Sequence, residues 1–147
     1  MQLSYSLSLP TDDRCVSVVR RIAVSTLTEL QVAPECVDDI ALALTEACAN
    51  VVQHGSQAGE FEVEVAVEDG ACRITVREEG GAFRGPGPGG VDVPAESADL
   101  DLLTSGRGIA LMQLLVDQLR YVPDESGTTV VLIKELQLQP GSALTSL

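Results

Sequence analysis

The chain has 147 residues, a length typical of one domain, and its apolar fraction of 45% is enough for a real core. Its formal net charge of −13 would repel nucleic acid and attract a basic protein partner, unless the acidity only maintains solubility. No basic leader and no run of about 20 apolar residues is present, so we expect neither a signal peptide nor a membrane span. Four widely spaced cysteines without a CxxC pair indicate reduced thiols in a cytoplasmic protein.

The first half of the chain predicts one strand and two helices. Leucine and tyrosine alternate with serine over residues 3–9, as in a half-buried strand. A helix then runs to about Leu30, with Asp12 and Asp13 suited to its first turn. Pro34 begins a second helix, which we expect to end at Gly55.

The second half predicts four strands, one helix and a long loop. Strands over 61–67 and 72–78 flank Asp69-Gly70, a strong hairpin signal. Residues 80–105 are rich in Gly and Pro and have no periodicity, which indicates a functional lid or disorder. A helix over 106–116 and strands over 118–122 and 128–136 follow, and we expect the tail, 137–147, to be flexible. This order predicts an α+β fold: a two-layer sandwich with helices on one face of a mixed sheet.

Polar residues interrupt the apolar second helix at a spacing of four: Glu46, Asn50 and His54. Positions four apart differ by about 40° around a helix, so Glu46 and Asn50 share one face. We expect this face to lie roughly opposite the apolar one that covers the sheet. The simple interpretation is a solvated helix face, with His54 near the helix's C-terminal carbonyls.

Two glycine-rich segments favour a ligand instead. "EEGGAF" follows a strand and "SGRG" opens a helix, whose free N–H groups and positive dipole end suit phosphate. A carboxamide can supply an oxygen to Mg²⁺, and a nearby carboxylate can orient a nucleophile. Neither segment matches the P-loop or the dinucleotide fingerprint.

Taken together, these pieces resemble the histidine-kinase-like ATPase superfamily, and more closely its anti-sigma factor serine-protein kinases. "EACANVVQHG" is similar to the family's Asn-bearing helix, "VREEGGAF" and "GRGIALM" to its two glycine boxes, and "GTTVVL" to its last motif. The resemblance covers residues 1–136, with an ATP lid at about 84–105. It implies ATP and Mg²⁺ as cofactors, Asn50 as metal ligand and Glu46 as catalytic base. The residues that it places at the nucleotide are Asn50, Glu78, Gly80, Ala82, Arg84, Gly106, Arg107, Gly108, Ile109, Thr128 and Thr129.

The resemblance also implies an anti-sigma factor that sequesters a sigma factor and phosphorylates a Ser or Thr of an antagonist protein of the STAS type. Arg20 and Arg21 on the first helix are the residues that it places at the sigma factor. A homodimer is a further state that it allows, without a diagnostic interface in the sequence.

Two departures leave a second function open. Glu78 stands where the family's first glycine box has Asp, and Ala82 stands where it has Gly. The alternative is a module of the same fold that regulates a partner by contact, with weak or no nucleotide binding. A sensor histidine kinase is disfavoured because the chain has no room for a phosphoacceptor helix pair. Length and charge disfavour a DNA-processing ATPase.

Overall fold

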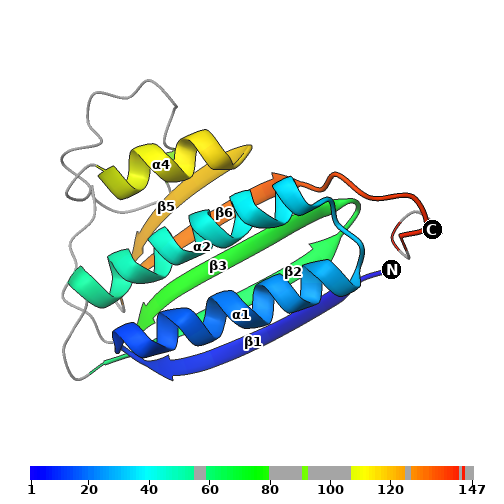
Figure 1. The fold of residues 1–147 in the computed structure, drawn as a ribbon. Coiled ribbons are helices and arrows are strands. Elements are labelled where there is room, and N and C mark those ends of the chain that lie inside the picture. The colour runs from blue at the N-terminus through cyan, green and yellow to red at the C-terminus, as the bar shows by residue number, and fades with distance from the viewer. Residues whose placement is uncertain (55–58, 80–90, 93–106, 125–126, 143, 145–147) are drawn as a thin grey trace.

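A computed structural model describes residues 1–54, 59–79, 91–92, 107–124, 127–142 and 144 of the chain. One sheet of six strands forms one layer, in the order β1-β2-β3-β6-β5-β4. The strands are β1 (Leu3–Pro10), β2 (Glu60–Glu68), β3 (Ala71–Glu79), β4 (Val91–Asp92), β5 (Gln118–Asp124) and β6 (Gly127–Glu135). Helices α1 (Asp13–Glu29), α2 (Pro34–His54) and α4 (Arg107–Leu115) cover one face of it (Figure 1). The α+β two-layer sandwich is thus confirmed.

The sheet is antiparallel at every described pairing, so the expectation of a mixed sheet was wrong. The reason lies in the helix pair between the first two strands. α1 and α2 run in opposite directions (Figure 1), so the chain re-enters the sheet at the end where it left, and Pro10 of β1 lies opposite Glu60 of β2. A single helix would have returned the chain at the other end and given a parallel pair.

Local signals determine the element ends as the sequence predicts. Asp69 and Gly70 adopt φ of 52° and 77°, the left-handed pair that a two-residue hairpin between β2 and β3 requires. Asp12 lies one residue before α1, where its carboxylate accepts the Arg14 N–H at 2.8 Å. It therefore caps the helix, and Asp13 is the acidic residue inside the first turn.

The core lies between the two layers, with α2 at its centre. Ile40, Leu44 and Cys48 are at most 1% exposed and face the sheet. Ala43 and Ala47 on the same helix are fully buried as well, because α2 lies between α1 and α4 (Figure 1). Burial thus extends beyond the single apolar face that the sequence pattern indicates.

Part of the long glycine- and proline-rich segment belongs to the sheet. Val91 and Asp92 form β4, which pairs with Tyr121 and Arg120 of β5. The sequence shows no periodicity here because two residues are too few for an alternation to be visible. The remainder of the expected lid, 84–90 and 93–105, lies outside the described residues.

The expected flexible tail docks on the connection between α1 and α2 over its first residues. Leu138 forms a bridge with Val32, and the Ala33 N–H donates to Gln137 O at 2.7 Å. Ser142 is 1% exposed, and its hydroxyl donates to Leu30 O at 2.6 Å. The expectation fails for 137–142 because these contacts satisfy the backbone at the end of α1, which no local pattern in the tail encodes.

Candidate functional site

The start of α4 lies against the polar line of α2. An atom in the Cβ position of Gly108 would lie 3.2 Å from Oε2 of Glu46, a tighter approach than most real Cβ contacts. Glycine at this position therefore lets the α4 backbone come within van der Waals contact of the carboxylate. The structure brings together two motifs that lie 62 positions apart in the sequence, one on each helix.

Glu46 and Asn50 lie on the flank of α2 that faces α4, and both are partly exposed. We expected this face to lie roughly opposite the residues that cover the sheet, and the structure adds that α4 packs against it. Ala43, two turns before Asn50, is fully buried, so this flank is a packed helix–helix contact. Towards the C-terminal part of α2, Glu46 and Asn50 on the same flank are partly exposed to solvent. Sequence reasoning missed Ala43 and Ala47 as positioning residues. Their spacing of four was the signal, since small residues let a second helix approach closely.

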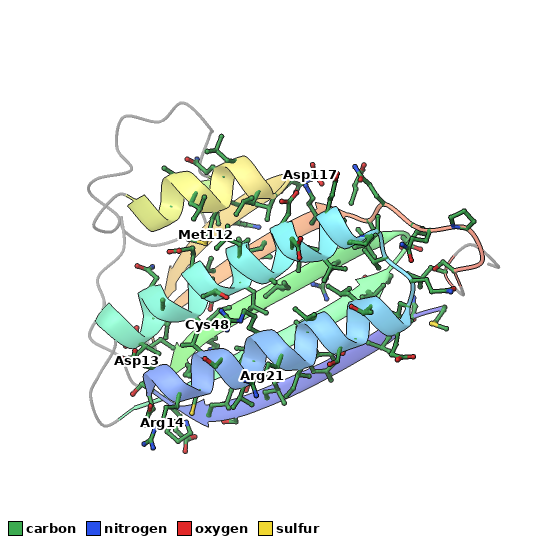
Figure 2. The ribbon with its side chains drawn as sticks, in the orientation of Figure 1. Asp13, Arg14, Arg21, Cys48, Met112 and Asp117 are labelled. Atoms are coloured by element: carbon green, nitrogen blue, oxygen red, sulfur yellow. The ribbon has the colours of Figure 1, made fainter. Side chains whose placement is uncertain are left out.

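Figure 2 shows how α4 packs beside α2, with Met112 directed into the contact and Cys48 beneath α2. Met112 and Ile109 are fully buried. This apolar anchoring fixes the position of the first turn of α4. The backbone N–H groups of that turn have no partner within the helix, and they form the positive end of the helix dipole. Such a helix start can bind an anionic group.

Glu78 lies near the end of β3, only 2% exposed, on the sheet face that the helices cover. It lies opposite Phe61 of β2, which is fully buried. A carboxylate in such surroundings requires polar partners, and Glu78 does interact within the protein. Its position at the strand end, on the same side as Glu46 and Asn50, suits a hydrogen-bond acceptor for a ligand between the two layers.

The structure separates some of the expected nucleotide residues from this site. Thr129 pairs with the exposed Arg77 in the β3–β6 register, so its side chain lies on the open face of the sheet, away from the helices. Ile109 contributes a core side chain, and only its backbone N–H remains for a ligand. Thr128 pairs through its backbone with Pro123. Gly80, Ala82, Arg84 and Gly106 lie outside the described residues, as do the side chains of Arg107, Thr128 and His54.

The expected partner residues lie elsewhere on the helix layer. Arg20 and Arg21 are exposed on α1, about 100° apart around the helix, and neither has an ion pair with another described residue. Figure 2 shows Arg21 midway along α1, on the far side of α2 from α4.

Two further kinds of side chain bear on the chemistry of the described residues: clustered metal ligands and thiols. Those residues contain no cluster of three or more His, Cys, Asp or Glu side chains that could hold a metal ion. The four cysteines are free, and burial raises the pKa of Cys48 and of Cys72 to about 12, so both thiols stay protonated. None of the described helices is long and apolar enough to cross a membrane.

Comparison with known proteins identifies the architecture. The model of the family described as "Histidine kinase-like ATPase domain" matches residues 9–134. The chain belongs to the histidine kinase-like ATPase family. Serine-protein kinase RsbW of Bacillus licheniformis is 30% identical over 136 residues, 86% of this chain and 82% of the relative. Serine-protein kinase RsbW of Bacillus subtilis (strain 168) is 27% identical over 139 residues, 88% of this chain and 84% of the relative.

A solved structure shows the same fold. The crystal structure of the RsbU and RsbW domains of Rv1364c from Mycobacterium tuberculosis superimposes with a TM-score of 0.62 at 22% identity. The match covers 91% of this chain and 32% of that longer chain. Membership of an ATPase family implies ATP as the ligand class.

Proposed function

We propose that this chain is an ATP-dependent anti-sigma factor kinase of the cytoplasm. It sequesters a sigma factor, and it transfers the γ-phosphoryl group of ATP to a Ser or Thr hydroxyl of an antagonist protein. The observation that carries the proposal is the contact between Gly108 and Glu46, which places the start of α4 beside the Asn50-bearing flank of α2. The similarity to serine-protein kinases over most of the chain supports the reaction class.

The side chains present suit Mg-ATP. Mg²⁺ commonly takes one or two protein oxygens and completes its shell with phosphates and water, so one carboxamide is a sufficient donor. In the proposed complex, Asn50 provides that oxygen, and the bound ion neutralises charge on the phosphates. The N–H groups at the start of α4 contact phosphate oxygens, and Glu78 accepts a hydrogen bond from the adenine amino group. Glu46, one turn before Asn50, accepts the proton of the incoming hydroxyl.

A contact-only regulator of the same fold is the second candidate. The favouring observation is Glu78, whose carboxylate is 2% exposed and already engaged within the protein. Compared with Asp, it also carries one more methylene, so adenine would need to shift to reach it. In this alternative, the chain binds its partner without phosphoryl transfer.

Two measurements on the whole chain separate the kinase from the contact-only regulator: the melting temperature with Mg-ATP, and incubation with labelled ATP, Mg²⁺ and a candidate antagonist carrying an acceptor serine. We expect a rise in melting temperature with Mg-ATP, because a ligand that binds only the folded state stabilises it. We also expect label on the antagonist. Absence of both the thermal shift and calorimetric heat at millimolar Mg-ATP would refute nucleotide binding. A thermal shift without transfer to any serine-bearing partner would leave the contact-only regulator.

The sigma-binding residues are open to a separate test. Charge reversal in Arg20→Glu or Arg21→Glu should weaken sigma factor binding by about tenfold, or about 1.4 kcal/mol, through a lost charge contact. Mg-ATP binding should not change, since α1 is separated from α4 by α2. Arg73→Glu makes the same charge change on the open face of the sheet and should leave sigma binding intact. Wild-type affinity for the sigma factor in all three variants would show that Arg20 and Arg21 do not belong to the interface.

A further inference from the structure

Two leucines on neighbouring helices point away from the sheet. Leu114 of α4 is 83% exposed, the most of any large apolar side chain that the structure describes, and Leu42 of α2 is 42% exposed. Each lies two positions, or about 200° around its helix, from a fully buried residue, which is Met112 in α4 and Leu44 in α2. Both leucines therefore belong to the outer surface of the helix layer and not to its core.

The two leucines lie near each other across the contact between α2 and α4. The helices run in opposite directions (Figure 1), and Gly108 lies beside Glu46. At 1.5 Å per residue, Leu42 is about 6 Å from the level of this contact along α2, and Leu114 is about 9 Å from it in the same direction along α4. Leu111, partly exposed and three positions after Gly108, lies on the flank of α4 that faces α2. Leu42, Leu111 and Leu114 together form what we call the leucine patch.

The leucine patch adjoins the carboxylate proposed as catalytic base. Leu42 lies one turn before Glu46 on the outer side of α2, and Glu46 is partly exposed. In the proposed reaction, the acceptor oxygen approaches Glu46, which takes its proton while the γ-phosphoryl group passes from ADP to that oxygen. Because the acceptor is a side chain of another protein, the surface around that side chain must lie against the helix layer next to Glu46. The leucine patch offers apolar contact area at this place.

The charges around the leucine patch restrict the chemistry of the partner. Asp38 and Asp39 lie about one turn before Leu42. Glu46 lies one turn after it, and α2 contains no Lys or Arg. Asp38 is exposed, and the side chain of Asp39 stays 43% exposed although it lies 3.8 Å from Lys134. In a chain with a net charge of −13, such a surface attracts a basic partner and repels an acidic one.

The proposed sigma factor surface differs from the leucine patch in place and in charge. Arg20 and Arg21 lie on α1, which α2 separates from α4 (Figure 1). Two cations favour an acidic partner surface, whereas the carboxylates around Leu42 favour a basic one. The partner at the leucine patch is therefore the protein that must reach Glu46.

We propose that the leucine patch is the docking surface for the phosphoryl-accepting antagonist, which presents an apolar side chain surrounded by Lys or Arg next to its acceptor serine. This proposal rests on the proposed kinase function, because Glu46 acts on a protein hydroxyl only in that function. The leucines determine the affinity for the protein substrate and take no part in the chemical step. Their replacement therefore raises KM for the antagonist and leaves kcat at saturation unchanged.

Steady-state transfer from labelled ATP, with the antagonist varied at saturating Mg-ATP, tests the proposal. Leu114→Glu and Leu42→Glu should each raise KM for the antagonist about tenfold, because each puts a charge into an apolar contact. Val18→Glu makes the same change at a 46% exposed position of α1, beyond α2, and should keep the wild-type KM. All three variants should keep the thermal shift with Mg-ATP, which shows that they are folded.

Direct binding separates a failure of the docking surface from a failure of the proposed kinase. An antagonist with alanine in place of its acceptor serine cannot take up phosphate, so calorimetry with Mg-ATP gives its Kd. We expect this Kd to rise about tenfold in the two leucine variants, and to rise for the wild type as salt screens the charges.

Each outcome has one meaning. If the wild type labels no STAS-type antagonist, the kinase and the docking surface are refuted together. If an antagonist is labelled but its KM and Kd are the same in Leu114→Glu, Leu42→Glu and Val18→Glu, only the docking surface is refuted. Loss of sigma factor affinity in the leucine variants, with unchanged antagonist affinity, would assign the leucine patch to the sigma factor instead. An antagonist Kd that salt leaves unchanged would overturn the basic character of the partner surface.

Discussion

Glu46→Gln should lower the rate of phosphoryl transfer to a serine-bearing antagonist by about 10²–10⁴, the usual contribution of a positioned acid or base. The substitution preserves size and removes the negative charge that accepts the proton. Because Glu46 is not a proposed nucleotide ligand, Mg-ATP and sigma factor binding should stay close to the wild type. Single-turnover transfer from labelled ATP measures the chemical step apart from product release.

Two further variants make this result specific. Glu35→Gln is the same substitution at an exposed position in the first turn of α2 and should transfer phosphate at the wild-type rate. Gly108→Ala places a methyl group 3.2 Å from Oε2 of Glu46, so the carboxylate must move by a few tenths of an ångström. We expect an intermediate loss of about tenfold, since small misplacements of a catalytic group reduce the rate. Wild-type rates in Glu46→Gln would make Glu46 an ordinary helix residue.

Asn50→Ala should abolish the Mg²⁺-dependent part of ATP binding, because it removes the carboxamide oxygen proposed for the metal. At a ligand concentration about 100-fold above Kd, binding stabilises the wild type by about 2.7 kcal/mol. For a domain of this size, that corresponds to a rise in melting temperature of roughly 5–10 °C. In Asn50→Ala, the shift with Mg-ATP should fall to the value obtained with ATP and a chelator.

Glu46→Gln is the matched control for this measurement, since it lies one turn away on the same flank and should keep the full thermal shift. The pair of variants thus separates metal binding from proton transfer. A full magnesium-dependent shift in Asn50→Ala would show that another residue holds the metal.

The strands and helices with strong local signals were predictable from the sequence alone. The alternation in β2 and β3, the Asp69-Gly70 turn and the start of α2 at Pro34 all depend on neighbouring residues, so a short window contains the necessary information. β4 and the docking of residues 137–142 were not predictable. Each depends on a partner distant in sequence, such as Tyr121 for Val91 and Leu30 for Ser142.

For the candidate site, the sequence itself placed Glu46 and Asn50 on one face of a helix and marked a glycine-rich helix start at Gly108. Only the tertiary structure decided that these two features meet, because α4 packs on the alanine-bearing flank of α2. It also placed Thr129 on the open face of the sheet, a consequence of strand register that a one-residue shift would reverse. Side-chain periodicity is a local property of the backbone, whereas register and helix packing are determined by which distant surfaces fit together.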